Sequence, residues 1–353
     1  MRKPPELLVM LAPALLVTAV VVAVGFTMGP SGDQERASDA PTQASPAATP
    51  SPPTPSTSAA ATEPKPQGKA RRDQLTGPRI TLELKPKPKF EVYDAFSFTI
   101  ASFNVLGHSH TVKGGNRKGY APSGVRMGWA LGALTGNGAD IVGLQEFQQP
   151  QFNNFNGRTG GAWDVWPGMA AGSLGVENSI AWRTDQFTAV QKKTVAIPYF
   201  GGRPRLMPYV LLQHDATGQK LWVANFHNPA DTKNHGNNTR WRRAATSREI
   251  SLANQLAGTG YPVFFTGDFN ERAEYFCPLT AKTTLKAANG GSTGGGCAPP
   301  PAMQVDWIFG SDEVAFSGYR VVDGALVDRA SDHPLVAAEV TVPELKVRLG
   351  SAG

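Results

Sequence analysis

The chain carries little excess charge of either sign where it is expected to fold. Its 34 lysines and arginines exceed its 28 aspartates and glutamates, but residues 1–90 hold 11 and 7 of these, which leaves 23 against 21 for the remainder. The sequence pI of about 9.3 is therefore largely a property of the N-terminal quarter. This excludes a uniformly basic nucleic-acid-binding domain and leaves room only for a local basic face.

Charged residues are absent from Leu7 to Met28, an apolar stretch of about 20 residues that Arg2 and Lys3 precede. A signal-peptide core usually has about 7–15 apolar residues, and this run is long enough to span a bilayer. The positive N-terminal flank predicts that the N-terminus is cytoplasmic and the rest of the chain outside. We expect residues 1–29 to be an uncleaved signal anchor, with a cleaved signal peptide as the alternative, and the protein to be extracytoplasmic.

Large apolar side chains are scarce between Gly29 and Lys89, where proline, serine, threonine and alanine dominate. Such a segment cannot bury a core, and residues 30–89 are expected to form an extended, disordered linker. Residues 90–353 remain for one folded domain, which is enough chain for a single large core.

Cysteine is also scarce, because Cys277 and Cys297 are the only two in the chain and nineteen residues, many of them glycine, lie between them. In a cytosolic protein these would be two unrelated buried thiols. Since the N-terminus indicates export, we expect a disulfide that ties a flexible loop, and this closure could contribute roughly 3 kcal/mol to stability.

Short strands outnumber helices in the expected domain. Phe96, Phe98 and Ile100 alternate in a strand that ends at Asn104, and no internal repeat is visible. Helical spacing is clear only over residues 126–134 and 240–256. Further strand-like runs cover residues 139–144, 178–182, 208–213, 221–226, 262–266, 305–309 and 334–340. This pattern predicts an α/β fold of two packed sheets with helices outside.

Polar side chains that can bind metals or handle protons follow or end these apolar runs. At a single strand end such a residue is ordinary turn chemistry, but eight of them indicate that several loops converge on one pocket. Carboxylate, amide and imidazole groups together suit a hard divalent cation and a phosphate ester. The eight are Asn104, Glu146, His227, Asp268, Asn270, Asp306, Asp332 and His333.

Six segments around these residues resemble the motifs of the endonuclease/exonuclease/phosphatase superfamily, which has the fold of deoxyribonuclease I. Their order and spacing agree from about Ser97 to Val340, and Gly267-Asp268-Phe269-Asn270 is the most specific of them. The resemblance implies a four-layer α/β/β/α sandwich with phosphoesterase activity. The segments are Ser102–Val105, Leu144–Glu146, Asn225–Pro229, Gly267–Asn270, Val305–Ile308 and Ser331–His333.

The resemblance also implies a metal site. Glu146 would be the principal ligand, with Asn104 and Asp332 close to it or acting through water. The oxygen ligands suit Mg²⁺ or Mn²⁺, with Ca²⁺ as a further alternative.

The remaining motif residues would carry the proton transfers. Asp306 would orient His333, while Asp268 and Asn270 would position the attacking water and His227 would face the phosphate. Either His333 with Asp306 or Asp268 itself would take the proton from the water.

Several cationic residues are candidates for contacts with substrate. Arg205 precedes a predicted strand where nuclease-like members carry a phosphate-contacting arginine, and Arg203 is an equally good alternative. Arg240 and Arg243 share one face of the second helix and could form a phosphate-binding rim, although a solvated helix face would look the same. His110 follows the first motif and is a candidate for a substrate loop.

We therefore expect a monomeric phosphodiesterase, attached to a membrane by its N-terminal segment. DNA or another nucleic acid is the favoured substrate, because the motif around His227 resembles that of deoxyribonuclease I-like members. A phospholipid or sphingomyelin phosphodiesterase would suit a membrane-proximal protein, and a phosphomonoesterase is a third alternative. A non-catalytic binding module on the same scaffold would belong to a different class.

Overall fold

A computed structural model of the chain describes residues 90–348. The predicted signal segment 1–29 and linker 30–89 lie outside the described residues. Between Phe90 and Arg348, no helix combines the length and the apolar character needed to cross a bilayer.

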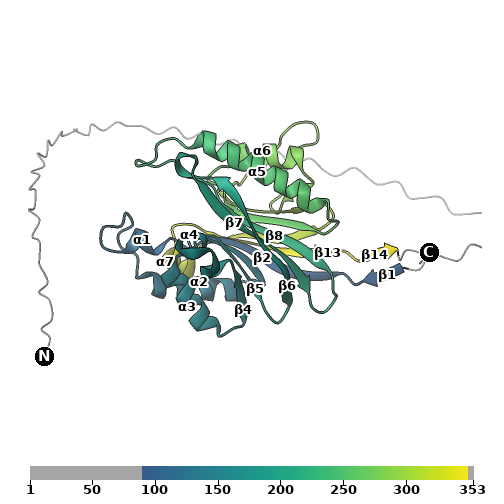
Figure 1. Cartoon of the computed structure of the whole chain (residues 1–353), viewed down its shortest axis with the longest axis horizontal. Coiled ribbons are helices and arrows are strands. Elements are labelled where there is room, and N and C mark those ends of the chain that lie inside the picture. The colour runs from purple at the N-terminus through teal and green to yellow at the C-terminus, as the bar shows by residue number, and fades with distance from the viewer. Residues whose placement is uncertain (1–89, 349–353) are drawn as a thin grey trace, which may run out of the picture. The chain divides into compact units, whose positions relative to one another are not determined.

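Two six-stranded sheets pack face to face, and helices cover both outer faces (Figure 1). In the first sheet β2 and β3 are parallel and the other neighbours are antiparallel. Its strands, in spatial order, are β12 (Ala315–Val322), β13 (Leu335–Val342), β2 (Phe96–Asn104), β3 (Ile141–Gln145), β5 (Ser179–Arg183) and β4 (Trp163–Trp166).

The second sheet is mixed in the same way, because β8 and β9 are its one parallel pair among the described strands. A separate two-stranded ribbon pairs β1 (Phe90–Tyr93) with β14 (Leu345–Arg348). The strands of the second sheet, in spatial order, are β10 (Leu285–Ala287), β11 (Asp306–Ser311), β9 (Val263–Asp268), β8 (Lys220–His227), β7 (Pro204–His214) and β6 (Phe187–Pro198).

Alternation along the strands divides the apolar side chains between three layers. In β2, Phe98 and Ile100 face the opposite sheet, whereas Ala101 and Phe103 face the helices. Because successive side chains of a strand point to opposite faces, one strand serves two cores. The predicted α/β/β/α sandwich is confirmed.

Both helices that the sequence pattern shows clearly are present, as parts of α2 and α5, and the domain has further helices that the pattern does not show. α3 is mostly polar and α6 contains Pro278, so neither displays a long apolar period. α2, α3 and α7 cover the first sheet, and α5 and α6 cover the second (Figure 1). The helices are α1 (His108–Thr111), α2 (Ser123–Gly136), α3 (Gln149–Thr159), α4 (Gly172–Gly175), α5 (Thr239–Ala257), α6 (Ala273–Lys282) and α7 (Ala325–Ala330), with short turns η1 (Gly168–Ala171) and η2 (Phe200–Gly202).

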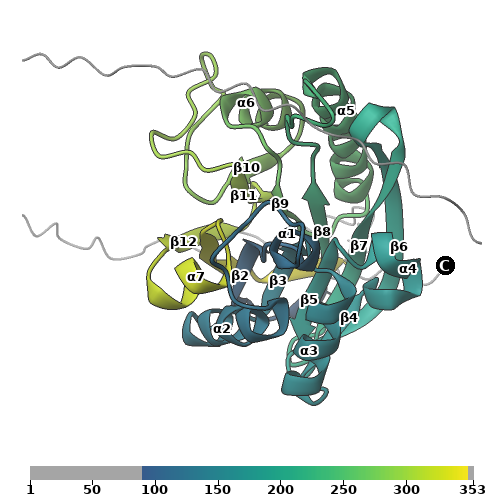
Figure 2. The same ribbon diagram turned by 90° about the vertical axis from the view of Figure 1, so that its left-hand side faces the viewer.

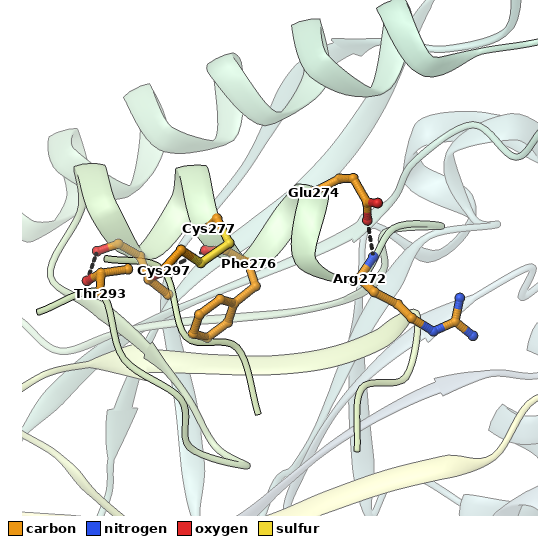
Figure 3. Close-up of a disulfide and its surroundings, with 7 residues drawn as sticks. Arg272, Glu274, Phe276, Cys277, Thr293 and Cys297 are labelled. Carbon is orange, nitrogen blue, oxygen red and sulfur yellow. Dashed lines mark hydrogen bonds between the residues drawn. A yellow bond between two sulfur atoms is a disulfide. The ribbon is translucent and has the colours of Figure 1, made fainter. Parts of the chain in front are cut away.

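The loop that follows β10 is tied to α6 by a disulfide between Cys277 and Cys297 (Figure 3). The two Cα atoms are 5.6 Å apart, and Ser292 pairs with Ala298 in a small bridge beside the second cysteine. The glycine-rich loop is thus closed on itself and held against the helix.

The parallel strand pairs fix where the predicted site residues lie. Asn104 pairs with Gln145 at the ends of β2 and β3, and His227 pairs with Asp268 at the ends of β8 and β9. Asp306, at the start of the antiparallel strand β11, is the other register partner of Asp268. All of these positions meet at one end of the sandwich, the end that Figure 2 shows to the viewer.

Candidate active site

The floor of the site is a buried polar network between the two sheets. Gln145 Nε2 donates to Asn225 Oδ1 at 2.6 Å, and Asn225 Nδ2 donates to the carbonyl of Leu144 at 2.9 Å. A methyl group at Gly143 would lie 2.0 Å from Thr266 Oγ1, so only glycine allows this close approach. Because the network is buried and largely satisfied, it holds the strand ends above it in fixed positions.

Asn104 joins the two halves of the site. Its Nδ2 donates to Glu146 Oε1 and to Asp268 Oδ2, both at 3.1 Å, and its own carbonyl accepts a hydrogen bond from Ser331 Oγ at 2.6 Å. The fully buried Asn104 therefore connects the end of β2 with three other segments, which are the residue after β3, the end of β9 and the residue after α7.

The backbone is strained where these side chains are presented. Leu106, Glu146 and Asn270 are the non-glycine residues with positive φ in the described part of the chain, at +50°, +56° and +53°. Left-handed conformations of such residues persist only when the surroundings impose them, and they gather at functional sites. All three lie within the motif segments or directly after them, which supports the assignment of this region as the active site.

Two histidines flank Asp268. The Nε2 atoms of His227 and His333 each lie 3.7 Å from Asp268 Oδ2, and His333 Nδ1 lies 2.9 Å from Asp306 Oδ2. The backbone amide of Asn270 donates to Asp268 Oδ1 at 3.0 Å, and its side chain donates to the carbonyl of Asn228. The structure thus brings the five predicted proton-handling residues together.

Burial and charge set the protonation of this group. Burial lowers the pKa of His333, but the hydrogen bond and charge of Asp306 outweigh it and raise the pKa well above its usual value. Burial and then the charge of Asp268 raise the pKa of Asp306. His333 is accordingly held as a cation between two carboxylates near neutral pH.

Glu146 lies across the site from these histidines. Burial opposes its ionisation, but the contacts of His110, His227 and the Gly107 amide prevail and hold the pKa of Glu146 well below its usual range. The Gly107 amide donates to Glu146 Oε2 at 2.8 Å. Glu146 is therefore an ionised carboxylate at physiological pH.

The loop after β2 brings two cations to the predicted metal-binding carboxylates. His110 Nε2 lies 3.2 Å from Glu146 Oε2, and Arg117 Nε lies 2.6 Å from Asp332 Oδ2. The sequence indicated His110 as a substrate-loop candidate but gave no signal for Arg117. That ion pair joins residues 215 positions apart and depends on the conformation of an irregular loop.

The donors at this end of the sandwich fit a hard divalent cation. Asp268 and Asp306 each place a carboxylate oxygen, and His333 a ring nitrogen, within 4.8 Å of one another. His333 would have to lose a proton before its nitrogen could bind a cation. Asp306 Oδ1 is buried without a hydrogen-bond partner, as expected for an oxygen that awaits a cation. The ionised Glu146 provides a further oxygen ligand, and Asn104 turns its Nδ2 toward Glu146 and its Oδ1 toward the Leu106 amide. Carboxylate and amide oxygens are the ligands that Mg²⁺ and Mn²⁺ prefer.

Arg205 lies on the rim of the site and is separated from His227 by the ring of Tyr199. Its guanidinium is ion-paired with Glu177 and lies over the ring of Tyr199, 4.6 Å from the centroid. The Tyr199 ring in turn is 5.9 Å from the His227 ring. Arg203 is exposed on the same hairpin. Tyr199 was not predicted, because its place in the site depends on how the hairpin folds back.

The arginines of α5 divide between surface and interior. Arg240 and Arg243 are exposed, and Arg240 lies over the Trp241 ring, 4.1 Å from its centroid. Arg242 is buried and pairs with Asp231 and Glu271, both at 2.8 Å. Arg240 and Arg243 remain free to contact an anion, whereas Arg242 anchors the helix.

Comparisons with known proteins agree with the geometry. The model of the endonuclease/exonuclease/phosphatase family matches residues 101–333. No curated protein matches the chain. Among solved structures, an endonuclease/exonuclease/phosphatase family protein from Bacteroides thetaiotaomicron has a TM-score of 0.56 at 18% identity, over 71% of this chain and 96% of its own.

Two further solved structures are similar over almost their whole length. A mannosyl-6-phosphatase from Bacteroides thetaiotaomicron has a TM-score of 0.54 at 19% identity, with 69% of this chain and 99% of its own covered. The catalytic domain of human Nocturnin, with bound sulfate, has a TM-score of 0.54 at 17% identity, with 72% and 97% covered. At such identities these similarities show the fold.

The family model spans more than half of the 353 residues and all six motif segments. Family members generally depend on a divalent metal ion, which the donor set accommodates. The chain therefore belongs to the endonuclease/exonuclease/phosphatase family, and it is an enzyme that acts on phosphate esters.

Proposed function

We propose that this enzyme is a Mg²⁺-dependent phosphodiesterase that cleaves nucleic acid outside the cytoplasm. The observation that carries the proposal is the arrangement around Asp268, where two imidazoles lie 3.7 Å from one carboxylate oxygen and a strained Glu146 faces them. Such a group can bind an anionic phosphate on one side and activate water on the other.

Different residues of the site would accept the proton of the attacking water and bind the phosphate. Asp268 Oδ1 accepts from the Asn270 amide and Oδ2 accepts from Asn104 Nδ2, so the carboxylate is held in place. Each carboxylate oxygen can accept more than one hydrogen bond, and Asp268 would take the proton of the attacking water. His333, kept cationic by Asp306, would hold a phosphoryl oxygen through Nε2, and His227 would hold the same phosphate from the other side. The charge of His333 therefore favours Asp268 over His333 as the base.

A divalent ion held by Glu146, with Asn104 and Asp332 acting through water, would polarise a phosphoryl oxygen and stabilise the charge that develops on it. Asn104 Nδ2 already orients the carboxylates of Glu146 and Asp268 toward each other. Asp332 would first have to leave Arg117, whose side chain is 48% exposed and can move toward an incoming phosphate.

Nucleic acid is favoured because several arginines gather near the site and form a local basic rim, although the domain as a whole has little net charge. The Tyr199 ring lies between Arg205 and His227 and contacts both side chains. Arg240 and Arg243 lie on α5, whose Trp241 packs against Gly202 of the Arg203–Arg205 hairpin. A rim of this kind suits a polyanion that extends beyond the scissile phosphate.

An activity panel tests the class of substrate. The purified full-length protein is incubated with plasmid DNA, RNA, sphingomyelin vesicles and mannose 6-phosphate, each with Mg²⁺, Mn²⁺ or chelator. We expect cleavage of nucleic acid that chelator abolishes. Turnover of sphingomyelin alone would favour the lipid phosphodiesterase, and turnover of the sugar phosphate alone would favour a phosphomonoesterase.

A salt series tests the arginine rim. Replacing Arg240, Arg243 and Arg205 with glutamine should lower the slope of log K against log salt by roughly 0.7–0.9 for each phosphate that the variant no longer neutralises. Arg183→Gln is a matched control, because Arg183 pairs with Asp185 at the far end of β5. Unchanged binding of DNA by the triple variant across the series would remove the main support for a nucleic-acid substrate.

The proposed location rests on the N-terminal sequence. Leu7–Met28 lacks charge and follows Arg2 and Lys3, and the Cys277–Cys297 disulfide is stable in an oxidising compartment. Protease added to intact cells should release an active fragment by cutting within residues 30–89. A mature N-terminus just after Gly25 or Gly29 would instead establish secretion.

A further inference from the structure

A hollow of about 410 Å³ opens next to the active site, beyond the histidines and carboxylates that would handle the scissile phosphate. The lining comes from α4, η2, the start of β7 and the loop before α5. It includes Leu174, Tyr199, Phe200, Arg203, Arg205 and His235. Tyr199 forms the wall toward the reaction centre, because its ring lies 5.9 Å from that of His227.

We propose that this hollow binds a nucleobase of the substrate, while the neighbouring phosphate lies between His227 and His333. The inference rests on the proposed function and specifies how a nucleotide would be recognised. Phe200 and His235 stack on each other with centroids 4.0 Å apart and planes 11° from parallel. Flat ring surfaces next to guanidinium groups are the platform on which bases stack in single-stranded nucleic-acid sites.

The lining argues against a lipid chain as the occupant. Three of the residues that line the hollow are aromatic or imidazole rings and two are arginines, whereas Leu174 and Pro204 are its aliphatic side chains. An acyl chain would gain nothing from the guanidinium groups of Arg203 and Arg205 and would hinder their hydration, which is unfavourable. A base presents both a flat face and polar edges, so it matches rings and cations together.

The hollow is built on a fixed hairpin tip. Gly201 and Gly202 adopt φ values of +66° and +78°, and a methyl group at Gly202 would lie 2.4 Å from the ring of Trp241. The tip is therefore clamped against the first turn of α5. His235 belongs to a loop closed by the bridge between Thr232 and Gly236, so both stacked rings come from supported segments.

The test compares two diesters that differ only in their bases. Initial rates of the full-length protein are measured on a thymidine dinucleotide and on the same diester with both bases removed. We expect kcat/KM about 10- to 100-fold higher with the bases, which is the range for stacking of one base on aromatic side chains. Phe200→Ala and His235→Ala should reduce that preference and leave turnover of the abasic diester at the parental level.

Val190→Ala is the matched control, because Val190 is exposed on β6 of the same hairpin and does not line the hollow. His235 is exposed, so its variant is expected to fold even if Phe200→Ala, which removes a contact with Tyr199, does not.

Equal parental rates on both diesters, or equal losses on both in the variants, would overturn the base pocket and leave the nuclease proposal standing. Cleavage of neither diester would overturn the proposed function and the pocket with it. Cleavage of sphingomyelin vesicles that depends on Phe200 would assign the hollow to a lipid instead.

Discussion

Replacing Glu249 with glutamine should stabilise the protein, and the gain should grow as the pH rises. Glu249 lies in α5 and is fully buried, and neither of its carboxyl oxygens has a hydrogen bond of normal geometry. The Tyr275 hydroxyl and the Asn228 amide face it and favour its charged form to some extent. Burial nevertheless dominates and raises the pKa of Glu249 from 4.5 to about 8.

The sign of the effect follows from proton binding. Between pH 4.5 and about 8 the folded protein keeps the proton on Glu249, whereas the unfolded chain releases it. The stabilising contribution of the neutral acid is therefore complete below pH 4.5 and is lost as the pH rises through that range, by about 1.4 kcal/mol per pH unit. At pH 7 the loss relative to acid pH is about 3 kcal/mol, and at pH 5 it is less than about 1 kcal/mol.

Glutamine keeps the shape of the protonated acid and does not titrate. The free energy of unfolding of Glu249→Gln and of the parent should be measured in urea at pH 5, 6, 7 and 8. We expect the variant to gain on the parent steadily across this series. Glu274→Gln is the control, because it makes the same substitution at an exposed position in the first turn of α6. A constant difference between Glu249→Gln and the parent would refute a buried, protonated Glu249.

Three further predictions concern the site and the disulfide. Glu146→Gln should weaken Mg²⁺ binding in calorimetry and abolish hydrolysis while the circular dichroism spectrum is retained, and near-parental turnover would show that the metal site lies elsewhere. Asp306→Asn removes the carboxylate that holds His333 against the phosphoryl oxygen and should lower kcat by about 10²- to 10³-fold with little change in KM; a change confined to KM would contradict the assigned role. Replacing Cys277 and Cys297 with serine should lower the free energy of unfolding by roughly 3 kcal/mol in urea without loss of turnover, and unchanged stability would remove the argument for a tied loop.

The sequence predicted the fold and the meeting of the motif residues because both follow from strand ends. Apolar alternation in β2 and the continuous run of β9 placed Asn104 and Asp268 at the ends of buried strands. The two strands belong to different sheets, and the face-to-face packing of the sheets brings these ends near one another. Helical spacing likewise separated the exposed Arg240 and Arg243 from the buried Arg242.

The contacts that the sequence did not predict depend on irregular segments. Arg117 reaches Asp332 through a loop that follows no period, and Tyr199 reaches His227 through the turn of a hairpin. β6, which carries Tyr199 just beyond its end, is an edge strand with many exposed polar side chains and was not expected. Such positions are set by three-dimensional packing, for which sequence spacing offers no guide.

The hydrogen bond from Ser331 to the carbonyl of Asn104 has a consequence for how activity arises during folding. It joins residues 227 positions apart, and His333 follows two residues later. A chain that has emerged only as far as its 300th residue holds Asn104 and Asp268 but lacks both Asp306 and His333. Contacts of such long range form late and slow the folding of the whole domain. Catalytic competence should therefore appear as one of the last events, when β13 joins β2, and recovery of turnover after dilution from denaturant should trail the recovery of helix and sheet signals.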